Sequence, residues 1–98
     1  MTSPASAGAR FTLLRCAPGS DAAARYDATI QAGEASYRAE LTLRDDGTVE
    51  AQPLGEPAPA ALWDKLIMFA RLTARGAPSR RAEGVVVWPA RVTRWRPS

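Results

Sequence analysis

Two acidic residues, Asp27 and Glu40, are the side chains whose predicted pairing could support acid–base chemistry. They are expected to lie opposite each other on adjacent strands, where two like charges repel unless they share a proton or bind a cation. Arg25 and Arg38 are close enough along the same strands to neutralise them. We therefore favour a solvated, charge-compensated sheet face, and an enzyme built on this pair is the least favoured interpretation.

The other residue types give little support for catalysis. The chain has no histidine, which removes the commonest general base and the commonest metal ligand. Its single cysteine, Cys16, therefore has no histidine to activate it and is expected to be a small core residue in a strand. No phosphate-binding loop, dinucleotide-binding glycine pattern or Cys-x-x-Cys motif is present. We expect a protein that is not an enzyme, with no cofactor and no metal.

The C-terminal segment combines arginine with tryptophan, a mixture that suits phosphate contact and base stacking. Residues 57–98 carry eight basic and two acidic side chains, whereas residues 1–56 carry five and eight. The candidate contacts to a nucleic acid are Arg80, Arg81, Arg91, Arg94, Trp95 and Arg96. The favoured alternative is that Trp88 and Trp95 are buried while the arginines stay in solvent, because tryptophan is largely buried on average. Twelve of the thirteen cationic residues are arginine, as a GC-rich, bacterial-like genome would also produce.

Any such site must be positioned by strands, and the clearest strand covers residues 36–44. Apolar and polar residues alternate strictly along it, which is typical of a strand with one buried and one solvated face. Residues 26–31 alternate in the same way. If Gly33 and Glu34 form a two-residue type II′ turn, every apolar residue of one strand meets an apolar residue of the other.

The second hairpin is predicted to have the three-residue loop Asp45-Asp46-Gly47. This loop sets Leu43 opposite Val49, whereas a two-residue loop would set Leu43 opposite Glu50. Gly47 then occupies the left-handed position that follows a type I turn. The loop length is therefore decided jointly by strand pairing and by turn chemistry.

Residues 60–75 contain strong helix formers, and Pro59 and Gly76 suit the two ends of a helix. Its apolar stripe is wider than a minimal packing face, so we expect part of it to contact another protein or a second copy of the chain. The residues assigned to this interface are Trp63, Ile67, Ala70 and Leu72. The alternative is that the chain's own N-terminal strand and C-terminal tail cover them.

Together these elements predict an α+β fold: a four-stranded antiparallel β-meander, one long amphipathic helix packed across its apolar face, and a C-terminal strand. Residues 10–16 are the expected first strand, residues 85–88 a short buried strand, and residues 91–96 a second short strand. Residues 1–9 are expected to be a disordered tail. Residues 10–98 are then one domain, since chains of this length seldom divide.

Composition agrees with an ordinary globular protein, at 46% apolar and 23% charged residues. No apolar run approaches the roughly 18 residues of a membrane helix, and a lone cysteine cannot form an internal disulfide, so a cytoplasmic location is expected. The sequence predicts a small protein-interaction domain of adaptor or accessory type, with a homodimer through the apolar helix as one form. The alternative is a nucleic-acid-binding domain that uses the C-terminal arginines and tryptophan.

Overall fold

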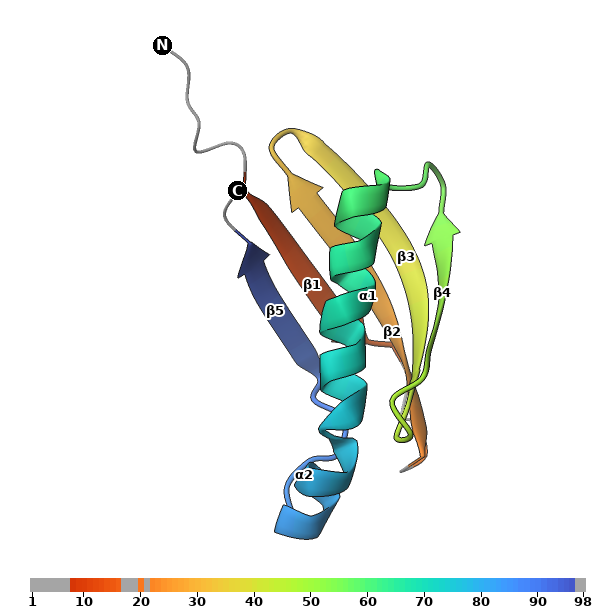
Figure 1. The fold of residues 1–98 in the computed structure, drawn as a ribbon, viewed down its shortest axis with the longest axis vertical. Helices are drawn as coiled ribbons and strands as arrows, with labels where there is room; N and C mark the ends of the chain where they lie inside the picture. Colours follow the sequence, from red (N-terminus) through yellow and green to blue (C-terminus); the bar gives the residue numbers. More distant parts are fainter. Residues whose placement is uncertain (1–7, 17–19, 21, 97–98) are drawn as a thin grey trace.

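A computed structural model of the chain describes residues 8–16, 20 and 22–96. Five strands form one antiparallel sheet in the order β4-β3-β2-β1-β5, so that the first four strands make a meander and the last returns beside the first. The strands are β1 (Ala9–Arg15), β2 (Ala23–Ala32), β3 (Ala35–Arg44), β4 (Val49–Leu54) and β5 (Arg91–Arg96). Helix α1 (Ala60–Arg75) lies across one face of the sheet, and α2 (Ala77–Glu83) extends beyond its end (Figure 1). The predicted α+β architecture is confirmed.

The first hairpin has the predicted register. Ala32 pairs with Ala35 across the two-residue turn, and Gly33 has a φ of 61°, as the first position of a type II′ turn requires. The same register sets Asp27 opposite Glu40 on the face of the sheet that α1 does not cover. The prediction that brought these two carboxylates together is confirmed.

The second hairpin also follows the prediction. Leu43 pairs with Val49, and Gly47 has a φ of 92°, in the left-handed region that favours glycine. The carboxylate of Asp46 accepts hydrogen bonds from the backbone N–H (2.9 Å) and the hydroxyl (2.7 Å) of Thr48. These bonds stabilise the charged carboxylate and lower the pKa of Asp46.

The core lies between the sheet and α1. Alternate residues of the strands are buried beneath the helix, and the helix contributes Leu66, Phe69, Ala70 and Thr73 to the same core. The rings of Phe11 in β1 and Phe69 pack edge to face with their centroids 5.1 Å apart. The predicted helix and its sheet-facing stripe are confirmed.

The segment between α2 and β5 differs from the prediction. Gly84 ends α2 with a φ of 76°, and residues 85–88 form no strand, with Val85 and Val86 exposed to solvent. The predicted buried strand is wrong, because Trp88 is buried and Val87 packs against the core while the first two valines of the run are exposed. The Trp88 indole donates to the carbonyl of Ser20 (3.1 Å), so side-chain bonds hold the segment in place instead of a strand ladder.

The first residues that the structure describes overlap the end of the predicted disordered tail. Residues 1–7 lie outside the described part of the chain, while Ala9 is the first residue of β1 and is buried. The structured domain therefore begins by Ala9, within the segment that was expected to be a tail. Neither described helix is long and apolar enough to cross a membrane.

Candidate functional site

The four helix residues predicted to bind a partner are separated by the fold. Ala70 is fully buried (0% exposed), because it lies one turn after Leu66 on the stripe that faces the sheet. Ala70 must therefore be removed from the predicted interface. Trp63 and Ile67 are half-buried, and Trp63 packs against the chain's own core. Only Leu72 is well exposed, at 54%.

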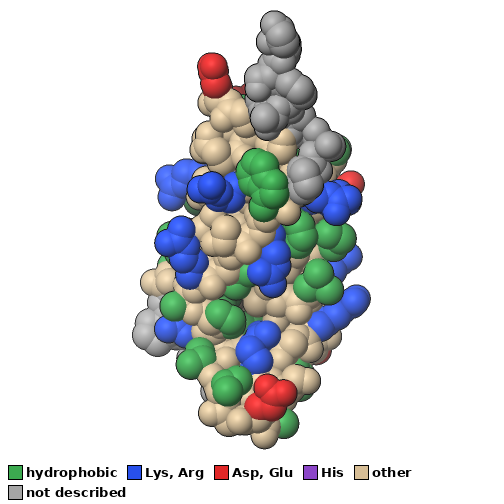
Figure 2. Space-filling view, turned by 90° about the vertical axis from the view of Figure 1, so that its left-hand side faces the viewer, with side chains coloured by type: hydrophobic (Ala, Val, Ile, Leu, Met, Phe, Trp, Pro, Cys, Tyr) green, Lys and Arg blue, Asp and Glu red, His purple; other side chains and the backbone are tan. Residues whose placement is uncertain are grey.

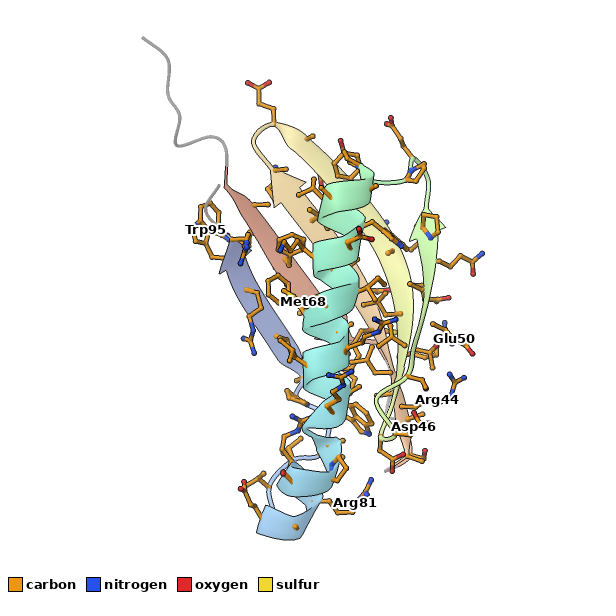
Figure 3. The ribbon with its side chains drawn as sticks, viewed as in Figure 1. Arg44, Asp46, Glu50, Met68, Arg81 and Trp95 are labelled. Atoms are coloured by element: carbon orange, nitrogen blue, oxygen red, sulfur yellow. The ribbon has the colours of Figure 1, made fainter. Side chains whose placement is uncertain are left out.

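The exposed apolar side of α1 faces β1 and β5. Phe69 contacts β1 through Phe11, and Leu72 lies one turn further along this side of the helix. Met68, one turn before Leu72, is also exposed, and it points toward the β1–β5 half of the sheet (Figure 3).

Other exposed residues gather on the same side of the molecule. Arg94 pairs with Phe11, and Arg96 pairs with Ala9, so both arginines project from the helix-covered face of β5. Seen from the β5 edge, hydrophobic and basic side chains are interspersed over most of the view (Figure 2). We name this region the β5-side surface; it comprises Met68, Leu72, Val85, Val86, Arg94 and Arg96.

The two strands beneath this surface carry charge of one sign. Strands β1 and β5 contain five arginines and no acidic residue: Arg10, Arg15, Arg91, Arg94 and Arg96. Acidic residues concentrate toward the opposite edge, where Arg44 pairs with Glu50 (3.0 Å) (Figure 3). Strands β1 and β5 therefore carry an excess of positive charge.

Two of the predicted nucleic-acid contacts are engaged within the protein. The Arg80 guanidinium donates to the carbonyls of Val87 (2.5 Å) and Thr73 (2.6 Å), which ties α1 to the segment after α2. Arg81 forms an ion pair with Asp45 (3.1 Å). These bonds hold the two guanidinium groups away from the surface formed by β5. The sequence alone does not show that Arg80 and Arg81 are engaged in this way.

The remaining predicted contacts lie together on β5. Arg91, Arg94, Trp95 and Arg96 are all exposed. Trp95 is 56% exposed and lies opposite Arg10 on the open face of the sheet. Its ring covers Gly8, where a Cβ would collide with the indole. The expectation that both tryptophans would be buried therefore holds for Trp88 and fails for Trp95.

The open face between β2 and β4 is charge-compensated. Glu40 forms an ion pair with Arg25, and this hydrogen-bonded pair raises the pKa of Arg25. A shallow depression of about 250 Å³ is lined by Glu40, Thr42, Glu50, Ala51 and Gln52. Within the described residues, no group of three or more His, Cys, Asp or Glu side chains could hold a metal ion. The ion pair between Arg25 and Glu40 is what a charge-compensated sheet face predicts.

Cys16 is exposed and does not belong to the core, so the sequence-based expectation for it is wrong. Odd-numbered residues Phe11 and Leu13 of β1 face the core, while Leu14 is exposed on the other face. Cys16 follows Leu14 by two positions and shares its direction, because side chains alternate along an extended chain. Leu13 and Leu14 are adjacent and both apolar, so the sequence alone does not define which residues of this strand face the core.

The two edges of the sheet differ in their backbone groups. The N–H of Arg44 donates to Thr48 (3.0 Å), and hydrogen-bonded pairs alternate along an antiparallel ladder. The outward-facing backbone groups of β4 therefore belong to Val49, Ala51 and Pro53. Since proline has no N–H, this edge is poorly suited to bind another strand.

The β5 edge has a full set of donors. The N–H of Arg15 donates to Ala90 (3.0 Å), so Val92, Arg94 and Arg96 are the β5 residues that bond to β1. The backbone groups of Arg91, Thr93 and Trp95 point away from the sheet, and no strand in the described part of the chain pairs with them. The Thr93 carbonyl accepts a hydrogen bond from the guanidinium of Arg94 (3.1 Å).

No protein-family model, curated protein or solved structure matches this chain.

Proposed function

We propose that the chain is a small non-catalytic protein-interaction domain that binds an acidic partner through the β5-side surface. The observation that carries the proposal is that exposed apolar residues lie on the same side of the molecule as β1 and β5. These two strands contain arginines and no acidic residue. A single exposed apolar residue is ordinary, whereas several on one side of a molecule support an interaction site. Apolar contact would supply affinity, and the arginines would select acidic partners.

The charge of this surface favours a different protein over a second copy. Two copies meeting along β5 would bring Arg94 and Arg96 of both chains into one contact, with no acidic side chain in either strand. The homodimer expected from the sequence is therefore the less favoured form of the interaction. We also propose a cytoplasmic location, in line with the lone exposed thiol of Cys16.

Selection of a random peptide library displayed on phage tests this function. We expect the enriched peptides to combine acidic and apolar residues, and synthetic copies to bind the purified domain in a fluorescence polarisation assay. Leu72→Asp and Arg94→Glu should each weaken binding at least about tenfold, a change of about 1.4 kcal/mol. Arg38→Glu, on the open face of β3, is the matched control and should have little effect. Peptides that bind all variants equally would refute the assignment of this surface.

A nucleic-acid-binding domain is the second candidate, because Trp95 lies exposed beside Arg10 on the open face of the sheet. Stacking of a base on an exposed aromatic ring contributes about 1–3 kcal/mol. Trp95 is, however, the one aromatic residue that the described strands present on this face. Binding of a single-stranded oligonucleotide that weakens with a log–log salt slope of about −0.7 per phosphate, and that Trp95→Ala abolishes, would favour this candidate.

A further inference from the structure

The β5 edge combines features that suit the addition of one more strand. Its outward N–H and C=O groups belong to Arg91, Thr93 and Trp95, and all three residues retain a donor. The β4 edge lacks one donor at Pro53. If a strand is to be added to this sheet, the backbone therefore favours β5.

The side chains on both faces of β5 indicate what the added strand would carry. On the helix-covered face, Arg94 and Arg96 emerge beside the exposed apolar side of α1. On the open face, Arg91 and Trp95 stand on either side of Thr93. A strand alongside β5 would meet basic groups on both of its faces, with an indole available to an apolar side chain.

We infer that the β5 edge captures an extended acidic segment of a partner protein, which pairs antiparallel to β5 and extends the sheet. This inference rests on the proposed function and adds the binding mode and the chemistry of the ligand. Main-chain hydrogen bonds to Arg91, Thr93 and Trp95 would supply affinity. Acidic side chains opposite Arg91, Arg94 and Arg96 would supply selectivity.

The register defines a probe. The complementary peptide is Glu-Val-Glu-Thr-Val-Glu, written from N- to C-terminus, with both ends blocked. Its residues lie, in that order, opposite Arg96, Trp95, Arg94, Thr93, Val92 and Arg91. The threonine of this peptide would exchange hydrogen bonds with Thr93, because both backbones present their groups at that position. The exposed Arg94 guanidinium, which donates to the Thr93 carbonyl, would move from that carbonyl to an acidic side chain of the peptide. The central glutamate, opposite Arg94, would turn its own N–H away from β5.

N-methylation of the peptide separates strand addition from attraction between side chains. Methylation of the threonine nitrogen removes a donor that faces β5, and we expect it to weaken binding at least about tenfold. Methylation of the central glutamate nitrogen is the matched control, because that N–H faces outward, and we expect affinity to be retained. The unmodified peptide should also slow hydrogen exchange at Arg91, Thr93 and Trp95.

Variants of the protein provide a second test. Thr93→Pro removes an N–H that is not used by the sheet, so the domain should fold, as unchanged hydrogen exchange in β2 and β3 would verify. Binding of the unmodified peptide should fall at least about tenfold in Thr93→Pro and stay close to the wild-type value in Thr93→Val, which retains the N–H.

The outcomes distinguish this inference from the proposed function. Equal binding of both N-methylated peptides, together with undiminished binding to Thr93→Pro, would overturn strand addition and leave an interaction through side chains. Failure of the probe peptide, alongside Leu72-dependent binding of selected peptides, would likewise overturn only the inference. Failure of every peptide, with salt-dependent binding of an oligonucleotide, would overturn both.

Discussion

At the scale of single residues, Arg80 and Arg81 show how adjacent identical side chains acquire different roles. Arg80 is half-buried and donates to two backbone carbonyls from separate segments. Arg81 is exposed and forms one ion pair with Asp45. Removing Arg80 would leave carbonyl groups without their charged donor, whereas removing Arg81 loses an interaction that water and salt already weaken.

We predict that Arg80→Ala lowers the free energy of unfolding by about 2 kcal/mol. The neighbouring variant Arg81→Ala is the control and should cost less than about 1 kcal/mol, as expected for a surface ion pair. Urea unfolding followed by circular dichroism measures both. Equal losses in the two variants would mean that Arg80 does not tie α1 to the segment after α2.

Gly47 provides a prediction about backbone conformation. Its φ of 92° crowds any Cβ against the backbone, so Gly47→Ala should destabilise the protein by about 1 kcal/mol or more. The nearest atom to such a Cβ is Cγ of Arg75 at 3.2 Å, in a flexible side chain, so the cost should come from φ itself. Gly47→Asn should cost less, because asparagine tolerates the left-handed region. An unchanged urea midpoint for Gly47→Ala would contradict this account.

At the scale of elements, β5 depends on the irregular segment that precedes it. The Tyr26 hydroxyl in β2 donates to the carbonyl of Pro89 (2.7 Å), and Arg15 in β1 donates to the carbonyl of Trp88 (2.7 Å). These bonds hold the chain as it approaches β5 and set the point at which its ladder with β1 begins. The β5 edge is therefore positioned by side chains of β1 and β2.

Tyr26 links this anchoring to pH. Burial raises the pKa of Tyr26 above its ordinary value of 10.0, because the ionised phenolate is poorly solvated in the core. The unfolded chain releases this proton at the ordinary pKa, so the stabilisation is complete below about pH 10 and is lost as the pH rises through the folded-state pKa.

We therefore predict that the free energy of unfolding of the wild type falls more steeply above about pH 10 than that of Tyr26→Phe. Urea unfolding at a series of pH values from neutral to alkaline measures the difference. At neutral pH the variant should be about 1 kcal/mol less stable, since it loses the bond to Pro89. Parallel pH profiles for the two proteins would show that ionisation of Tyr26 is not coupled to folding.

At the scale of the whole molecule, the surface is electrically polarised across the sheet. Basic strands β1 and β5 lie at one side, and the acidic residues Glu40 and Glu50 lie in β3 and β4 at the other. An asymmetric field of this kind steers charged partners toward one side and raises association rates at low salt. It also opposes contact between two β5-side surfaces.

This polarisation leads us to expect a monomer in solution. Light scattering at micromolar concentration should give the mass of one chain at both low and physiological salt, because repulsion between the β5-side surfaces is not offset by any acidic residue of β1 or β5. Leu72→Asp should have the same mass. A dimer in the wild type that Leu72→Asp dissociates would contradict this prediction and support self-association through the apolar helix.

The strands, the hairpin turns and the long helix could be predicted from the sequence, because each depends on interactions between near neighbours. Alternation of apolar residues along residues 36–44 defines the buried face, and Gly33 and Gly47 supply the positive φ that each turn needs. Pairing and turn chemistry then agree on one register, which places Asp27 opposite Glu40. Arg91, Arg94, Trp95 and Arg96 of β5 are exposed, and their predicted contact with a nucleic acid stays a prediction.

The surface that could bind a partner was decided only by the tertiary structure. A wide apolar stripe does not reveal which strands the helix covers. From the sequence, Trp63 and Leu72 are therefore equally good candidates for exposure, and it is the contact between Phe11 and Phe69 that shows how α1 is oriented on the sheet. The hydrogen bonds that Arg80 donates to backbone carbonyls and the exposure of Val86 likewise depend on tertiary packing. The backbone amides of β5 that point outward are those not used in its pairing with β1. Because β1 and β5 are far apart in the sequence, local sequence patterns do not predict this pairing.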